Sequence, residues 1–189
     1  MTLDQRLLTG KDRRDYEKVR LFFGEVAKHI PLSADTPIVD LCCGNGMLGF
    51  YFLELYPEGY VHFYDQQQTE RFRELAEGKT NYTFHQEDIN TLTQTEEGIL
   101  LSIHACYILT DKVIELGLQE HKPFAIMPCC HRREMIQQCE TPPHVLHTYG
   151  LADYIDITRA NAIRDQGRSC TLTEIKRNRK KKNNLIIVP

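Results

Sequence analysis

The sequence predicts an α/β protein with a doubly wound, mostly parallel, seven-stranded sheet that ends in an antiparallel hairpin. β-prone and helix-prone segments alternate between residues 37 and 166, which is typical of a parallel sheet with helices on both faces. Two further β-prone runs, 170–175 and 184–188, are separated by only a short loop. Such a loop is long enough for an antiparallel pair but too short for a parallel crossover.

Each element follows from a local pattern. Apolar residues recur at helical spacing over 19–27, so a helix precedes the first strand. Pro57 ends the next helix, and Pro128 ends the fifth strand. Thr110 and Asp111 suit a helix start, with Thr as the cap. The expected strands are 37–41, 60–65, 81–86, 98–104, 124–127, 170–175 and 184–188, and the expected helices are 12–29, 46–56, 68–77, 109–119, 131–139 and 150–166.

The 189 residues suffice for one domain with a sizeable core. We expect a single domain over residues 1–189, with residues 1–35 as an N-terminal helical extension. No run approaches the roughly 18 consecutive apolar residues of a membrane span, and the N-terminus lacks the layout of a signal peptide. The seven cysteines, an odd number, are better explained as free thiols than as a disulfide framework. We therefore expect a cytoplasmic protein without membrane contact.

The net charge of −3 conceals an uneven distribution. Residues 121–189 carry twelve Lys and Arg against six Asp and Glu, whereas residues 54–120 carry four against thirteen. The basic side chains concentrate in the run 176–182, which includes Lys180, Lys181 and Lys182. Such a run is suited to binding phosphates, although a solvated loop explains it equally well.

The segment 37–49 joins an apolar, β-prone run to an amphipathic helical one through a glycine-rich turn. Asp40 ends the first run, and Gly44 and Gly46 let the backbone turn sharply and approach a ligand closely. The turn also directs the first N–H groups of the helix at that ligand. The pattern is neither Gly-x-Gly-x-x-Gly nor a phosphate loop, and an ordinary βα turn is the simplest alternative.

Two later β-prone runs also end in acids, Asp65 and Asp88. An acid about 20 residues after such a turn can accept hydrogen bonds from both hydroxyls of a ribose. Three β-runs that each end in an acid predict a nucleoside site. The residues expected there are Asp40, Cys42, Gly44, Gly46, Asp65, Gln66, Asp88, Ile89 and His104.

The pattern hydrophobic–Asp–x–x–x–Gly–x–Gly resembles motif I of the class I S-adenosylmethionine (SAM) methyltransferases. That family has a Rossmann-like sheet with its seventh strand inserted antiparallel. Its glycine loop receives the amino-acid end of SAM. The resemblance implies SAM as the cofactor, with Asp65 at the ribose and Asp88 at the adenine amino group.

Two clusters of reactive side chains follow the fourth and fifth expected strands. Their layout, His-x-Cys-x-x-x-Thr-Asp and then Cys-Cys-His, resembles a methyltransferase-like subgroup of SAM methyltransferases. The subgroup includes the eukaryotic tRNA 2′-O-methyltransferase of the acceptor stem and a glutathione-transferase-linked relative. The resemblance covers about residues 36–131 and extends weakly to the segment from Asp156 and Arg159 onward. Tyr107 departs from it, since those relatives tend to have glycine there, and the zinc-finger modules of the tRNA enzyme are absent from this sequence.

Methyl transfer to a hydroxyl requires alignment and a group that takes or orients the hydroxyl proton. His104 and His131 are the candidate bases, because imidazole changes charge near physiological pH. Asp111 either orients one of these imidazoles or simply favours the start of its helix. We expect these three residues to be catalytic.

Cys129 and Cys130 are open to three interpretations: small packed residues, walls of the acceptor pocket, or metal ligands together with His104, Cys106 and His131. Adjacent cysteines lack the Cys-x-x-Cys spacing that lets both thiolates face one ion, so no metal is predicted. The residues assigned to substrate binding are Cys129, Cys130, Arg132, Lys180, Lys181 and Lys182.

These features predict a SAM-dependent methyltransferase that acts on RNA, with tRNA favoured and a ribose 2′-hydroxyl as the acceptor. The first alternative is a small-molecule or protein methyltransferase, which a deep, enclosed pocket without a basic rim would favour. The second is a non-catalytic module of the same fold that binds RNA or a partner protein, which failure to bind SAM would indicate.

Overall fold

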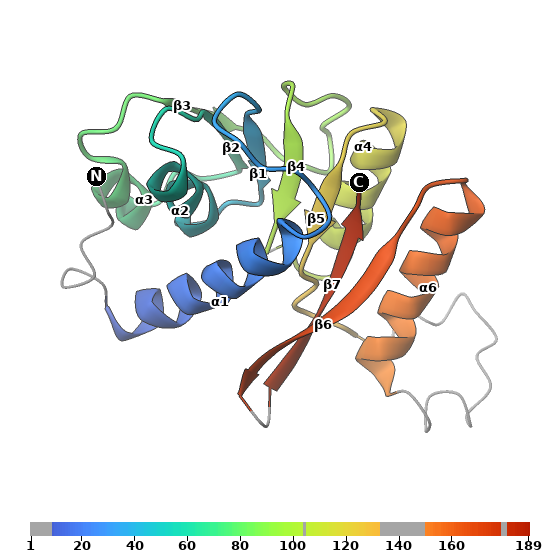
Figure 1. The fold of residues 1–189 in the computed structure, drawn as a ribbon. Helices are drawn as coiled ribbons and strands as arrows, with labels where there is room; N and C mark the ends of the chain where they lie inside the picture. The colour runs from blue at the N-terminus through green and yellow to red at the C-terminus, as the bar shows by residue number, and fades with distance from the viewer. Residues whose placement is uncertain (1–8, 104, 133–149, 179–180) are drawn as a thin grey trace.

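The computed structural model describes residues 9–103, 105–132, 150–178 and 181–189. One seven-stranded sheet runs through the molecule in the order β3-β2-β1-β4-β5-β7-β6 (Figure 1). The strands are β1 Ile38–Leu41, β2 Val61–Asp65, β3 Tyr82–Gln86, β4 Ile99–Ser102, β5 Phe124–Ile126, β6 Thr171–Asn178 and β7 Lys181–Val188.

The first five strands are parallel, and β7 is antiparallel to both β5 and β6. The predicted mostly parallel sheet with an antiparallel closing hairpin is confirmed. β1 has β2 on one side and β4 on the other, so the direction of winding reverses beside β1. In open sheets of this kind, ligands bind at the carboxyl ends of the strands next to this switch point.

Helices cover both faces of the sheet. The helices α1 Gly10–Val26, α2 Met47–Leu55 and α3 Glu70–Ala76 lie on one face, and α4 Leu109–Gln119 and α6 Leu151–Asp165 lie on the other (Figure 1). The residues of β1 are divided between two hydrophobic cores, one on each face of the sheet. Ile38 packs in the core beneath α1, α2 and α3, and Val39 and Leu41 pack in the core beneath α4 and α6. β1 is therefore buried on both faces, as strands of a covered parallel sheet are.

The basic run 176–182 was expected as a loop between two strands. In the structure β6 extends to Asn178 and β7 begins at Lys181, so most of the run is paired backbone. Lys176 and Lys182 are directly opposite each other in this pairing. The antiparallel ladder continues past the apolar residues because its hydrogen bonds come from the main chain and do not depend on the side chains.

The prediction that Thr110 caps its helix is wrong. α4 begins after Ile108 without a side-chain cap, and the buried hydroxyl of Thr110 instead donates a hydrogen bond to the Ala105 carbonyl (2.6 Å). The helix predicted at 131–139 falls on a segment of which residues 133–149 lie outside the described part. Within the described residues, every helix is too short or too polar to cross a bilayer.

Candidate active site

A cavity of about 330 Å³ opens where β1 and β2 end, at the switch point of the sheet. Most of the residues predicted for the nucleoside site meet there. The residues that line it are Cys42, Gly44, Tyr64, Asp65, Gln66, Glu87, Ile89, Asn90 and Leu109. The sequence therefore located this cavity from local patterns that are far apart along the chain.

The glycine-rich turn after β1 adopts the predicted sharp geometry. Gly44 and Gly46 have φ angles of 56° and 73°, in the left-handed region that glycine tolerates. A Cβ atom at Gly46 would lie 2.7 Å from the rings of Phe50 and Phe72, so this glycine is required by packing. Gly44 borders the cavity, and its N–H donates a hydrogen bond to Asp65 Oδ2 (2.8 Å). Asp65 thus holds the turn as well as lining the cavity.

Asp40 lies below the cavity and not in its wall. Its side chain is buried, and Oδ2 accepts a hydrogen bond from the Gly49 N–H in α2 (3.1 Å). Burial raises the pKa of Asp40 to about 8, and the nearby Asp65 carboxylate acts in the same direction, while the Gly49 N–H opposes them. The acid that ends β1 therefore ties the strand to the helix that follows the turn.

Asp88 lies next to the cavity wall in the loop after β3. Its Oδ1 accepts hydrogen bonds from the backbone N–H and the side-chain amide of Asn90, both at 2.9 Å. These bonds, together with one from Gln66, hold the pKa of Asp88 below its usual range. Asp88 thus stays a carboxylate at neutral pH, and its adenine contact remains a prediction. His104 lies outside the described residues.

A second cavity, of about 320 Å³, lies between the segment after β5, the start of α6 and strand β7. It brings together two residues predicted to face the substrate, Cys129 and His131, and several that were not predicted. Its lining consists of Pro128, Cys129, His131, Gly150, Leu151, Ala152, Asp153, Asn183 and Asn184.

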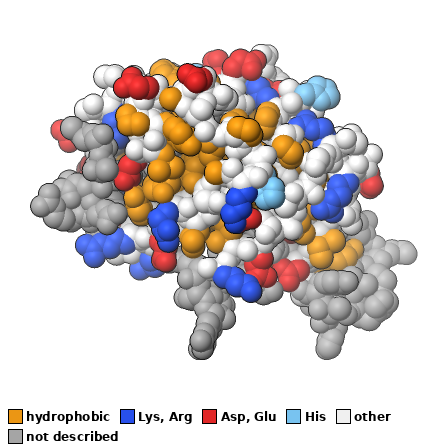
Figure 2. Space-filling model, viewed as in Figure 1, with side chains coloured by type: hydrophobic (Ala, Val, Ile, Leu, Met, Phe, Trp, Pro, Cys, Tyr) orange, Lys and Arg blue, Asp and Glu red, His pale blue; other side chains and the backbone are white. Residues whose placement is uncertain are grey.

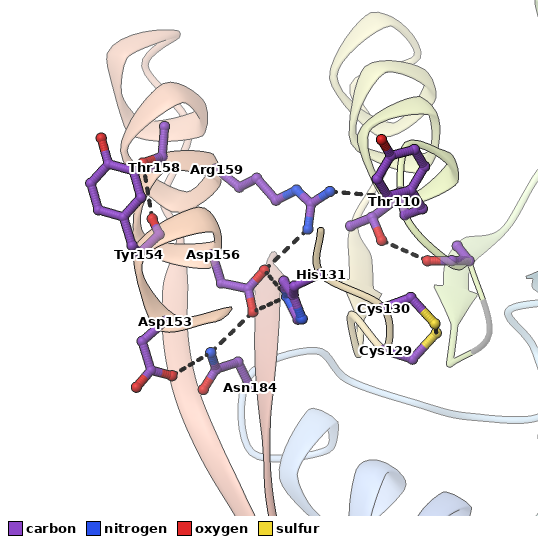
Figure 3. Close-up of polar contacts among 12 residues, drawn as sticks. Thr110, Cys129, Cys130, His131, Asp153, Tyr154, Asp156, Thr158, Arg159 and Asn184 are labelled. Atoms are coloured by element: carbon purple, nitrogen blue, oxygen red, sulfur yellow. Dashed lines mark hydrogen bonds and ion pairs between the residues drawn. The ribbon is translucent and has the colours of Figure 1, made fainter. Parts of the chain in front are cut away.

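His131 is hydrogen-bonded to Asp156, a residue that was not predicted for the site. The imidazole Nε2 lies 3.0 and 2.9 Å from the two carboxylate oxygens of Asp156 (Figure 3). Asp156 is on α6 and is fully buried, and it also accepts hydrogen bonds from Arg159 (3.1 Å) and Asn184 (3.0 Å). In the sequence, only the weak similarity of this segment to the relatives pointed to Asp156.

Asp111 binds the guanidinium of Arg159 and not the imidazole of His131, whose orientation was one of the two roles considered for it. Arg159 Nε and Nη2 reach the two oxygens of Asp111 at 2.6 and 2.9 Å, in the two-pronged geometry that suits a guanidinium and a carboxylate. Arg159 Nη1 contacts Asp156, so the described contacts connect Asp111 to His131 only through Arg159 and Asp156. The sequence placed Asp111 near the site but did not identify its partner.

Tyr107, which stands where the similar proteins tend to have glycine, adopts a backbone conformation that suits glycine. Its φ is 62°, in the left-handed region that glycine adopts readily and other residues adopt at a cost. Its carbonyl accepts a hydrogen bond from Arg159 Nη2 (3.1 Å), and its ring lies 5.0 Å from the Arg132 guanidinium. The surrounding contacts therefore offset the strain of a left-handed tyrosine.

Three cysteine sulfurs meet beside the second cavity. Cys106 follows β4, and Cys129 and Cys130 follow the neighbouring strand β5. The Sγ of Cys106 lies 2.6 Å from that of Cys129 and 3.3 Å from that of Cys130, and the adjacent pair is 3.7 Å apart. Cys129 and Cys130 are consecutive, which argued against their binding one metal ion together. In the fold, however, their sulfurs lie close to each other and to that of Cys106.

The predicted phosphate-binding lysines are only partly described. Lys180 lies outside the described residues, and Lys181 and Lys182 are placed by their backbone in β7. Asn183 and Asn184 follow them directly and line the second cavity. The backbone of the run therefore leads into the cavity wall.

Comparison with known proteins agrees with this geometry. Residues 14–138 match the sequence profile of a methyltransferase domain. The chain is 31% identical over 112 residues to the glutathione S-transferase C-terminal domain-containing protein of Xenopus laevis, a match to 56% of this chain and 18% of that protein. It is 36% identical over 58 residues to ribosomal RNA large subunit methyltransferase G of Shewanella oneidensis, covering 31% of this chain and 14% of that protein. The chain thus spans less than a fifth of the length of these relatives.

Solved structures share the fold at low sequence identity. A SAM-dependent methyltransferase from Aquifex aeolicus superposes with a TM-score of 0.60 at 16% identity, covering 94% of this chain and 96% of the other. Magnesium protoporphyrin IX methyltransferase from Synechocystis, solved with bound SAM, gives 0.61 at 11% identity, covering 100% of this chain and 85% of the other. Because the match over residues 14–138 covers well over half of the chain, the chain belongs to the methyltransferase domain family, whose cofactor is SAM.

Proposed function

We propose that this protein transfers the methyl group of SAM to an RNA, with tRNA the favoured class and a ribose 2′-hydroxyl the acceptor. The observation that carries the proposal is the pair formed by His131, which lines the second cavity directly after Cys130, and Asp156, which is hydrogen-bonded to Asn184 of the basic hairpin. The pair has the components of a general base: an imidazole that can take a proton and a buried carboxylate that orients it.

The first cavity has the groups that SAM requires. Gly44 offers backbone without a side chain, and Asp65 offers a carboxylate for ribose hydroxyls, with Gln66 and Ile89 beside it. When bound, SAM supplies a methyl group attached to a positively charged sulfur. The residues of this chain that would hold it are Cys42, Gly44, Asp65, Gln66 and Ile89.

Asp156 determines which imidazole nitrogen can act as the base. With Nε2–H donating to Asp156, Nδ1 carries the lone pair and can accept the proton of an acceptor hydroxyl. Arg159 and Asn184 each donate a hydrogen bond to Asp156, which fixes the position of the carboxyl group in the buried site. Proton removal makes the hydroxyl oxygen a better nucleophile, and His131 retains the proton until solvent removes it.

The basic hairpin favours RNA over a small acceptor. The backbones of Lys176 and Lys182 are paired in β6 and β7, within the basic run 176–182, and a run of this kind is suited to binding phosphates. Elsewhere, on the face shown in Figure 2, Lys and Arg side chains are interspersed with Asp and Glu and form no broad basic patch. A ribosomal RNA methyltransferase among the relatives points the same way.

The charge argument is tested by replacing Lys180, Lys181 and Lys182 together with Gln. We expect weaker binding of tRNA and a flatter dependence of log K on log salt, because each phosphate contact contributes a slope of about −0.9. The matched control replaces Lys11, Arg13 and Arg14, three exposed cations in α1, with Gln. SAM affinity, measured by calorimetry, should not change in either protein. An unchanged RNA affinity and salt slope in the hairpin variant would make a small-molecule acceptor the better proposal.

The base is tested separately by single-turnover methylation of tRNA with His131→Ala. We expect the rate to fall by roughly 10²–10⁴-fold with both substrates still bound. Nucleoside mass spectrometry of the product identifies the acceptor atom. A 2′-O-methyl product made at the wild-type rate by His131→Ala would rule out the proposed base.

A further inference from the structure

We propose that Cys106, Cys129 and Cys130 form a zinc site at the ends of β4 and β5. Their Sγ atoms all lie within 4.8 Å of one another, the arrangement expected of three ligands to a single ion. Thiolate sulfur is a preferred ligand of Zn²⁺. Among the described residues, no His, Asp or Glu joins this group, so the three sulfurs would leave a fourth position for water or another ligand.

The sulfur spacing fits a mononuclear site. A Zn–S bond of about 2.3 Å places the sulfurs of a tetrahedral ion roughly 3.8 Å apart. The Cys129–Cys130 distance is 3.7 Å and the Cys106–Cys130 distance is 3.3 Å. To admit the ion, the Cys106–Cys129 pair, at 2.6 Å, must separate by about 1.2 Å and the Cys106–Cys130 pair by about 0.5 Å, which rotation about the Cα–Cβ bonds can provide.

The sheet supplies the ligand set that sequence spacing does not. β4 and β5 are neighbouring parallel strands, so the segments that leave them emerge side by side. Cys106 comes from one segment and the Cys129–Cys130 pair from the other. Cys130 is exposed and the other two are half-buried, which gives an ion access from solvent.

Packing alone does not account for three sulfurs in mutual contact. A thiol is a weak hydrogen-bond donor and a weak acceptor, so reduced cysteines gain little from one another. A bound ion would instead cross-link two loops. Because His131 follows Cys130 directly and Cys129 lines the second cavity, the same ion would fix the backbone that carries His131. This structural role does not depend on which acceptor the enzyme uses.

The test begins with the full chain, purified without an affinity tag or chelator and in the presence of reductant. We expect about one zinc per chain by elemental analysis. Removal of the metal and titration with Co²⁺ should then give the intense absorption of thiolate-bound cobalt. Cys106→Ser and Cys130→Ser should each weaken metal binding by at least about tenfold, since a lost ligand matters more than a lost outer-shell contact.

Cys170→Ser is the matched control, because Cys170 is another half-buried cysteine that lies at the start of β6 outside the cluster. It should keep the wild-type metal content and the cobalt spectrum. Circular dichroism checks that each variant is folded, and the cobalt titration of the wild-type protein decides the question even if a variant unfolds. A reduced, folded wild-type protein that binds neither zinc nor cobalt would overturn the proposal. So would a disulfide between Cys106 and Cys129, located by mass spectrometry of unreduced peptides from protein purified without reductant.

Discussion

The buried Asp40 makes a sharp prediction about the stability of the protein as pH changes. The pKa of Asp40 is about 8 in the folded protein, against 3.8 for an unperturbed Asp. Over most of the pH range between these two values, the folded state holds a proton that the unfolded state has lost. A group whose pKa is higher in the folded state stabilises the fold fully at pH values below its pKa in the unfolded state. This stabilisation is lost as the pH rises toward its pKa in the folded state. The free energy of unfolding should therefore decrease between pH 4 and pH 8 because of this residue.

The expected size follows from the shift. Each pH unit within the window changes stability by 1.36 kcal/mol for one proton, so the three units from pH 5 to pH 8 give a decrease of up to about 4 kcal/mol. The variant Asp40→Asn cannot titrate at this position, and it keeps an oxygen that can accept the Gly49 N–H bond. Its curve should lack this decrease. Urea denaturation at several pH values gives both curves, provided the slopes m agree.

Other titrating groups affect both proteins alike, so the difference between the two curves isolates Asp40. The exposed Asp35 provides the control: Asp35→Asn should follow the wild-type curve. Parallel curves for wild type and Asp40→Asn from pH 5 to pH 8 would refute the reasoning. They would show that Asp40 is charged in the folded state and that burial does not dominate its ionisation.

Three further predictions concern the two cavities and the turn. Asp65→Asn should keep the Gly44 hydrogen bond but weaken SAM binding by about 1.5–3 kcal/mol in calorimetry, whereas wild-type affinity would exclude Asp65 as the ribose ligand. Asp156→Asn should destabilise the fold by about 3 kcal/mol in urea and also slow single-turnover methylation, and a folded variant with the wild-type rate would show that the carboxylate is only structural. Gly46→Ala should lower Tm more than Gly78→Ala, because the two glycines share φ near 72° but only Gly46 faces rings at 2.7 Å; equal losses would rule out crowding as the cause.

The first cavity, where we propose that SAM binds, could be predicted because its signals are local. The strand, the glycine turn and the helix lie within residues 38–55, and Asp65 ends a recognisable strand. Gly46 shows the limit of this reasoning: its φ was predictable from the pattern, but its contact with Phe72 on α3 depends on tertiary packing. The sequence therefore locates the cavity without fixing which glycine faces the ligand.

The second cavity, where we propose that the acceptor binds, depends on contacts between residues that are distant along the chain, and here prediction was weaker. His131 was identified by its residue type, but its partner Asp156 lies on a helix that no local pattern connects to it. The same holds for Asp111 and Arg159, which meet only because α4 and α6 pack against each other. The Cys-Cys spacing rule considers one segment at a time, so it argued against a metal interpretation that already included Cys106, whose sulfur lies 3.3 Å from that of Cys130.

The insertion of β7 between β5 and β6 has a consequence for the order in which the molecule opens. Among the described strands, β6 ends the sheet and pairs with β7 alone, whereas β1 pairs with β2 on one side and with β4 on the other, so fewer main-chain hydrogen bonds hold the outer hairpin in place. We expect amide exchange in β6 and β7 to be faster than in β1 and β4, and equal protection throughout would contradict this order. Each opening of the hairpin would withdraw Asn184 from Asp156 and release the imidazole pair, while the glycine turn stays folded. Local unfolding would thus silence the second cavity first and leave a protein that still binds its cofactor.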